Sequence, residues 1–135
     1  MTLFFLVIDT AREELAWVRA GHDPAIVFDP DNDSFEEIGG SGMALGVDEK
    51  YIYGEQSRAR PSKGRVIVLG TNGVWEASDL QGNRFGKKSV YDAVRMHHHR
   101  SASEILDSIF CAQTAFQGEA KKEDDATLVV IKIQK

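Results

Sequence analysis

Two adjacent carboxylates, Asp124 and Asp125, stand just before the last apolar segment of the chain. Two negative charges at the end of a strand repel each other unless a cation lies between them or solvent covers them. Mg²⁺ and Mn²⁺ prefer oxygen ligands and suit such a position. A solvated charged turn explains the same pair, so these two residues alone leave a metal site and a surface turn both open.

A second segment that could carry chemistry, Gly70 to Val74, contains the pair Asn72-Gly73. It follows the most apolar strand candidate, residues 65–69, and loops at strand ends often carry functional groups because the strand fixes their direction. Asn-Gly is also the pair favoured in type I′ hairpin turns. The segment is therefore consistent with a functional loop and with a structural turn.

The remaining chemically active residues favour structural roles. Three consecutive histidines, His97 to His99, point in different directions on a helix and cannot all face one ion. The single cysteine, Cys111, has no basic neighbour one helical turn away, which predicts a buried structural thiol rather than a nucleophile. His22 lies in a Gly-His-Asp-Pro segment and is interpreted as a residue that stabilises a turn.

The elements that must position these residues are β-rich at first and helical later. Apolar runs predict strands over residues 3–8, 15–18, 25–28, 35–38, 65–69 and 127–133, and an edge strand within 51–59. The first run is apolar throughout, which predicts a strand covered on both faces, and the last run predicts a closing strand that is central in its sheet at first. Helical spacing predicts helices over 86–98 and from Ser101 to a stop at Gly118, the second introduced by a capping box of Ser101 and Glu104. Strands followed by helices indicate an α+β fold.

Composition narrows the classes of function. The chain has 135 residues, of which 42% are hydrophobic and 27% charged, as in an ordinary globular domain. A net charge of −5 argues against binding to nucleic acid, which is held mainly by Lys and Arg. The longest apolar run, residues 3–8, is far shorter than the roughly 20 residues of a membrane helix. We therefore expect no nucleic-acid or membrane partner. The single cysteine, which cannot form an intrachain disulfide, and the lack of a basic region before the first apolar run favour a cytoplasmic protein.

Taken in order, five short segments resemble the bacterial PP2C-type serine/threonine phosphatases of the SpoIIE/RsbU group. The segments are Ala20-Gly21-His22-Asp23-Pro24, Gly42-Met43-Ala44-Leu45-Gly46, Leu69-Gly70-Thr71-Asn72-Gly73-Val74-Trp75-Glu76-Ala77, Gly82-Asn83-Arg84-Phe85-Gly86 and Asp124-Asp125-Ala126-Thr127-Leu128-Val129-Val130. The family patterns at these places are approximately AGHxP, GxxLG, TDGVxEA, GxxFG and DDxTLVV. The resemblance covers essentially the whole chain.

The resemblance implies a PP2C-like β-sandwich with flanking helices that hydrolyses phosphoserine and phosphothreonine with two Mn²⁺ or Mg²⁺ ions. In that family the ions present a shared water as hydroxide and stabilise charge on the phosphoryl oxygens. Carried over by position, Asp124 is the implied metal ligand and catalytic residue, and Asp125 is its supporting neighbour. Asn72 stands where the family has a metal-binding aspartate, and Gly73 keeps the loop backbone close to the metal.

Two departures from the family pattern bear on activity. Residues 1–135 contain no counterpart of the upstream aspartate motif that bridges both metals, so we interpret the chain as a single partial domain, truncated on its N-terminal side. Asn72 also replaces a carboxylate by a neutral amide, which at an effective dielectric near 20 costs on the order of 1–4 kcal/mol of metal affinity. We expect weak or no independent metal binding and no phosphatase activity.

Two functions remain open on this interpretation. In the first, the chain is part of a phosphatase that acts on a phosphorylated regulatory protein, such as an anti-sigma-factor antagonist, and is inactive in isolation; the retained Asp124 and Asp125 favour it. In the second, it is a non-catalytic pseudophosphatase that binds a partner in bacterial signalling, which Asn72 favours. Truncation would leave sheet edges uncovered, and such edges pair with other chains, so a homo-oligomer through residues 3–8 is also expected.

Overall fold

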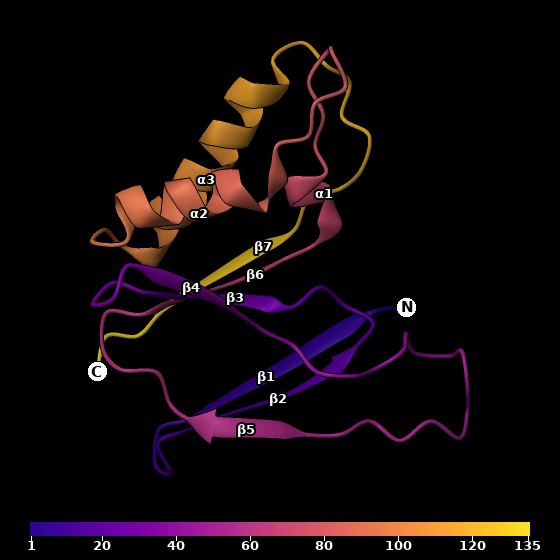
Figure 1. The fold of residues 1–135 in the computed structure, drawn as a ribbon, viewed down its shortest axis with the longest axis vertical. Coiled ribbons are helices and arrows are strands. Elements are labelled where there is room, and N and C mark those ends of the chain that lie inside the picture. The colour runs from indigo at the N-terminus through magenta and orange to yellow at the C-terminus, as the bar shows by residue number, and fades with distance from the viewer.

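The computed structural model describes residues 1–135 as two antiparallel sheets and three helices. The elements are β1 (Leu3–Asp9), β2 (Glu14–Ala20), β3 (Ala25–Asp29), β4 (Ser34–Ile38), β5 (Gln56–Ala59), β6 (Val66–Gly70), α1 (Asn72–Trp75), α2 (Gly86–His97), α3 (Ala102–Gln117) and β7 (Leu128–Lys132). One sheet has the order β1-β2-β5 and the other β4-β3-β6-β7. Figure 1 shows α2 and α3 above the four-stranded sheet, with the three-stranded sheet below it.

The first core lies between the two sheets. It is formed by Leu15, Trp17, Ala25, Val27, Ile38, Ile67 and Ile133. Because successive side chains of a strand point to opposite faces, β3 sends Ala25 and Val27 into this core and Ile26 and Phe28 towards the helices. Both faces of β3 and β6 are therefore covered, which explains why these strands are apolar along most of their length.

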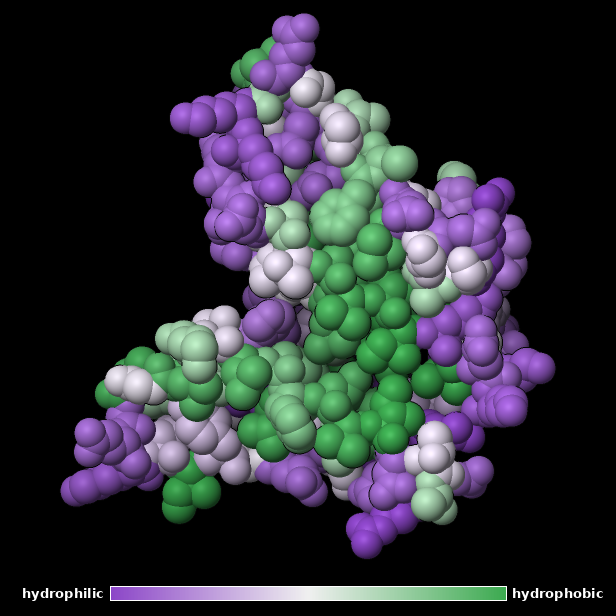
Figure 2. Space-filling view, turned by 180° about the vertical axis from the view of Figure 1, so that it is seen from behind, coloured by the Kyte–Doolittle hydropathy of each residue, from purple (hydrophilic) through white to green (hydrophobic).

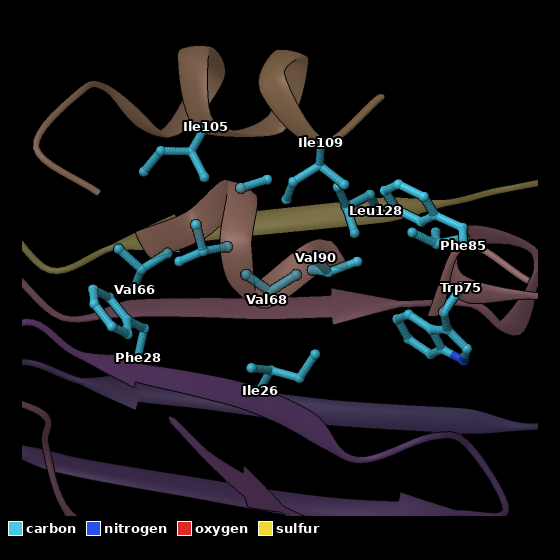
Figure 3. Packing of buried hydrophobic residues seen from close by; sticks show 13 residues of the cluster. Ile26, Phe28, Val66, Val68, Trp75, Phe85, Val90, Ile105, Ile109 and Leu128 are labelled. Carbon is cyan, nitrogen blue, oxygen red and sulfur yellow. The ribbon is translucent and has the colours of Figure 1, made fainter. Parts of the chain in front are cut away.

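The second core lies between the four-stranded sheet and the helices. In Figure 3, Ile105 and Ile109 point from α3 towards the sheet whose strand β6 carries Val66 and Val68. The predicted capping box starts α3: the Ser101 hydroxyl accepts from the Glu104 N–H (3.2 Å), and the Glu104 carboxylate accepts from the Ser101 N–H (3.0 Å). Gly118 ends the helix with φ +56°, also as predicted.

The prediction that the first strand is covered on both faces is wrong. β1 is an edge strand, and nothing covers the outer face of its sheet. The side chains that point inward pack against the first core, whereas Leu3, Phe5 and Val7 are 44%, 57% and 42% exposed. Figure 2 shows a continuous apolar region across the middle of one side of the molecule. A continuous apolar run cannot distinguish one covered face from two, which is why the prediction failed.

Three smaller predictions also need correction. Cys111 is exposed rather than buried. The predicted strand within residues 51–59 is an edge strand, but only Gln56–Ala59 pairs. The closing strand, β7, lies at the edge of its sheet and not at the centre.

The predicted fold class is confirmed: the chain is an α+β protein in which a β-sandwich is flanked by helices. No helix combines the length and the apolar character needed to cross a membrane.

Candidate functional site

The ends of β6 and β7 bring the two sequence-predicted site segments together. The strands pair antiparallel with Gly70 opposite Leu128, so the residues that follow β6 meet the residues that precede β7. The Thr71 N–H donates to the Thr127 carbonyl (3.0 Å), and the Thr127 N–H donates to Thr71 Oγ1 (3.0 Å). The Asn72-Gly73 segment therefore lies beside the Asp124-Asp125 segment.

Asn72 and Gly73 begin the one-turn helix α1, so they do not form the type I′ hairpin turn that their sequence also allowed. Thr71 precedes the helix in an extended conformation, and its hydroxyl contacts the segment that precedes β7 instead of capping α1. A Cβ at residue 73 would overlap the backbone oxygen of Asp125. Glycine is required there because the two segments touch through their backbones.

Two side chains from other elements fix the position of α1. Gln113 of α3, which is only 6% exposed, donates from Nε2 to the carbonyls of Gly73 (3.0 Å) and Val74 (2.7 Å). On the opposite side, Trp75 Nε1 donates to Asp23 Oδ2 (3.0 Å) in the β2–β3 turn. The site segment is thus held between the helical layer and this turn.

A polar hollow of about 290 Å³ opens beside Asn72. It is lined by Thr2, Gly21, His22, Asp23, Gly70, Thr71, Asn72 and Glu76. Asn72 Nδ2 donates to Glu76 Oε2 (3.2 Å), and the other oxygen of Glu76 pairs with Arg84 (3.3 Å). His22, interpreted from sequence as a turn residue, has Nδ1 at 2.9 Å from the Asp23 carbonyl, consistent with that role, although its side chain also borders the hollow.

The loop that carries Arg84 is ordered by Asp79. The hydrogen bond from the Asn83 side chain (2.8 Å), together with donation from backbone N–H groups, holds the pKa of Asp79 below its usual value despite some desolvation. Asp79 is therefore ionised in neutral solution and closes the turn before Arg84.

Asp124 lies in a second, smaller hollow of about 60 Å³. The hollow is lined by Gly73, Glu76, Ala77, Gln113, Gln117, Lys122, Glu123 and Asp124. Asp124 is exposed, and its Oδ1 accepts the N–H of Asp125 (2.8 Å). Of the predicted residues, Gly73 and Asp124 share this hollow, Asn72 faces the polar hollow, and Asp125 contributes backbone contacts. Glu76 lines both hollows.

The donor set does not amount to a self-sufficient metal centre. No three His, Cys, Asp or Glu side chains lie where they could hold one ion, and this includes the run His97 to His99. The Asn72 amide is engaged with Glu76, and Asp124 is the only carboxylate of the predicted ligand set. As arranged here, these residues do not fit a pair of divalent ions.

Sequence reasoning missed three residues that build the site, namely Glu76, Asp23 and Gln113. Glu76 follows Asn72 by four positions, a spacing that brings side chains together only on a helix. The helix α1 is a single turn and leaves no periodic signal, so this spacing could not be recognised. Gln113 carried no signal because a buried glutamine on an amphipathic helix looks like a surface residue.

A third hollow is apolar and lies between the free edges of β1 and β7. This groove has a volume of about 420 Å³, and its apolar lining is Phe4, Phe5, Leu6, Ile8, Leu69, Val129 and Ile131. It borders Gly70 and Thr71, so it reaches the edge of the polar hollow.

Comparison with known proteins places this arrangement in a family. Residues 1–134 match the family of stage II sporulation protein E (SpoIIE). The chain is 25% identical over 132 residues to the phosphoserine phosphatase RsbU of Bacillus subtilis, covering 98% of this chain and 38% of RsbU. The chain therefore spans well under half the length of this relative.

Solved structures show the same fold. The chain is similar to the SiaA-PP2C domain of Pseudomonas aeruginosa, with a TM-score of 0.84 and 21% identity over 98% of this chain and 52% of that one. It is also similar to a structure of SpoIIE from Bacillus subtilis that comprises the PP2C phosphatase domain and a fragment of the regulatory domain, with a TM-score of 0.77 and 17% identity over 98% of this chain and 37% of that one. The chain belongs to the SpoIIE family and has the fold of a PP2C-type phosphatase domain fragment.

Proposed function

We propose that the chain supplies one part of the active site of a metal-dependent protein serine/threonine phosphatase and does not hydrolyse phosphoserine by itself. The observation that carries this proposal is the junction of β6 and β7, which sets Asn72 and Gly73 beside Asp124 and Asp125. The same junction offers a single carboxylate of the expected ligand set, and no three ligating side chains converge. Residues 1–135 are proposed to act as one partial domain.

Asp124 is the proposed catalytic, metal-binding residue at this junction, for Mn²⁺ or Mg²⁺. The Asp125 N–H donates to one of its oxygens, which orients the carboxylate, and Gly73 keeps the backbone of α1 close to it. The side-chain carbonyl oxygen of Asn72 is proposed as a neutral metal ligand. Tight binding of two ions requires more carboxylates than these residues place together.

The proposed substrate is a phosphorylated regulatory protein, such as an anti-sigma-factor antagonist, in the cytoplasm. Its support is the similarity to RsbU, a phosphoserine phosphatase. The acidic character of the chain, with a net charge of −5, also favours a protein substrate over a nucleic acid.

A second candidate function is a non-catalytic module that acts by binding a partner. The hydrogen bond between Asn72 and Glu76, together with the ion pair between Glu76 and Arg84, favours it because these side chains have partners without a metal. In this case the fold is retained for its surface and not for chemistry.

Self-association through β1 is compatible with either function. The edge of β1 is unpaired, and the strand is apolar from Leu3 to Ile8, so an antiparallel second copy of β1 with Leu3 opposite Ile8 would place apolar residues opposite apolar residues. Pairing of this kind would also close one side of the apolar groove.

Calorimetric titration with Mn²⁺ tests the proposed site without relying on turnover. We expect weak binding by the unaltered chain and at least roughly tenfold tighter binding by Asn72→Asp, because a carboxylate adds charge next to the ion. Adding Asp124→Ala to Asn72→Asp should abolish this gain. Tight binding of two ions by the unaltered chain would contradict the proposal, and no gain from Asn72→Asp would favour the non-catalytic module.

A further inference from the structure

Asn72 is the only asparagine of the chain that is followed by glycine. The other two, Asn32 and Asn83, are followed by Asp33 and Arg84. Asparagine is among the residues that degrade chemically in water. Its side-chain carbonyl is attacked by the backbone nitrogen of the next residue, and this attack is least hindered when that residue is glycine, which has no Cβ.

The local structure exposes the Asn72 side chain, whereas Gly73 is buried, so the attack requires α1 to open. Asn72 is exposed and is the first residue of α1, a helix of one turn that lacks a side-chain cap. A single turn is the least stable length of helix, because its few hydrogen bonds hardly offset the conformational entropy lost. The Gly73 N–H is among the first N–H groups of the helix, which have no acceptor within it.

The competing asparagines are better restrained. Asn32 donates to Asp29 (2.8 Å), and Asn83 donates to Asp79 (2.8 Å) while its own N–H donates to the same carboxylate (2.8 Å). Asn72 has one longer hydrogen bond, of 3.2 Å, to the exposed Glu76. Sequence and structure therefore single out the same residue.

We propose that Asn72-Gly73 is a deamidation site at which water converts the Asn72 amide into a carboxylate facing Glu76. The Gly73 nitrogen forms a bond to Asn72 Cγ and loses its proton, and the Cγ–Nδ2 bond breaks to release ammonia. The resulting cyclic imide takes up one water molecule and opens. Opening at one carbonyl gives aspartate with an unaltered backbone, and opening at the other gives isoaspartate, whose main chain is longer by one carbon.

The aspartate product changes the electrostatics of the polar hollow. The hydrogen bond from Asn72 to Glu76 is lost, and two carboxylates then face each other four residues apart on one helical turn, which is destabilising unless a proton or a cation lies between them. Asp23 borders the same hollow. The product also has the residue type of the family pattern at this position, so this consequence, but not the deamidation itself, rests on the proposed function.

The isoaspartate product fits the structure less well. Gly73 already touches the backbone oxygen of Asp125, so an extra main-chain carbon before it must displace α1. We therefore expect chains that carry isoaspartate at position 72 to unfold at a lower temperature than chains that carry aspartate there.

The test is a time course of the folded chain in mildly alkaline buffer at physiological temperature, followed by peptide mapping with mass spectrometry. We expect the peptide that contains residue 72 to gain the mass difference between a hydroxyl and an amino group, while the peptides with Asn32 and Asn83 stay unchanged. The Asn72→Gln variant should show no such gain, because its longer side chain forms the corresponding ring far more slowly. The chain unfolded in denaturant gives the intrinsic rate at each asparagine.

The outcomes separate this inference from the proposed function. An Asn72 that stays intact in the folded chain while it converts in denaturant overturns the inference, as does equal conversion of all three asparagines. Conversion at Asn72 supports the inference whether or not the product hydrolyses a phosphopeptide. The Asn72→Asp variant is a homogeneous form of the aspartate product. In the presence of a chelator it should unfold at a lower temperature than the unaltered chain, and adding Mn²⁺ should raise its unfolding temperature again.

Discussion

Replacing Gln113 by methionine should lower the free energy of unfolding by about 2 kcal/mol and loosen α1. Gln113 is the only buried polar side chain of the chain, and its Nε2 donates to the carbonyls of Gly73 and Val74 at 3.0 and 2.7 Å. Each buried acceptor left without a donor costs about 1–3 kcal/mol, and part of this is offset by the apolar surface that methionine buries.

The matched control is Gln117→Met on the same helix. Gln117 is half-buried and makes no side-chain hydrogen bond, so its replacement adds the same apolar side chain without removing a donor. The difference between the two variants should appear as a loss of about 8 °C in the midpoint of thermal unfolding for a chain of this size. Amide hydrogen exchange should also accelerate in α1 and remain unchanged at the start of α3.

Two results would refute this reasoning. If the two variants unfold within about 0.5 kcal/mol of each other, the amide of Gln113 contributes nothing beyond its volume. If Gln113→Met is destabilised but exchange in α1 is unaffected, the side chain stabilises α3 instead of holding the site segment.

Three further predictions concern the site, the helix surface and the free edge. Gly73→Ala should cost about 1–3 kcal/mol, measured by denaturant unfolding, because the added methyl group overlaps a backbone oxygen. Burial, followed by the charge and hydrogen bond of Glu37, raises the pKa of Tyr91 to about 12, so Glu37→Gln should lower that pKa in an absorbance titration of the phenolate. Because the pKa of Tyr91 in the folded chain lies above the ordinary value of 10.0, the neutral phenol contributes to the free energy of unfolding below pH 10. This contribution is lost as the pH rises towards 12. Phe5→Lys should reduce self-association in light scattering, because it places a charge on the free strand β1.

Each of these has a matched control. Gly54→Ala should be nearly neutral, since a Cβ there meets no atom within 4 Å. A titration of Tyr91 that is unaltered by Glu37→Gln would show that burial alone sets its pKa. Ile52→Lys changes another exposed apolar side chain, 89% exposed and outside the sheets, and should leave association unchanged. A monomer at high concentration in the unaltered chain would contradict pairing through β1.

The elements that could be predicted from sequence are those whose pattern reflects the packing directly. The apolar runs of β3 and β6 predict strands, and the capping box locates the start of α3 because the side chains of Ser101 and Glu104 each accept from the backbone N–H of the other residue. The run from Leu3 to Ile8 is also continuously apolar, yet its outer face is uncovered, because a strand's own sequence does not specify what packs on it.

The site could be predicted only in part. The order of five motifs indicated that Gly73 and Asp124 belong together, and the pairing of β6 with β7 supplies the physical reason. Glu76 could not be found without knowing that residues 72–75 are helical. The exposure of Cys111 could not be predicted either, because residues that flank the apolar stripe of α3 can lie on either side of its interface with the sheet.

The central claim is that this chain carries part of a phosphatase site and cannot complete it alone. Its most direct test is hydrolysis of a phosphoserine peptide with and without Mn²⁺, measured on the unaltered chain, freshly prepared so that Asn72 is intact, and on Asn72→Asp. We predict no hydrolysis by either, because no three ligating side chains converge at the junction of β6 and β7. Mn²⁺-dependent hydrolysis by the unaltered chain would contradict the account.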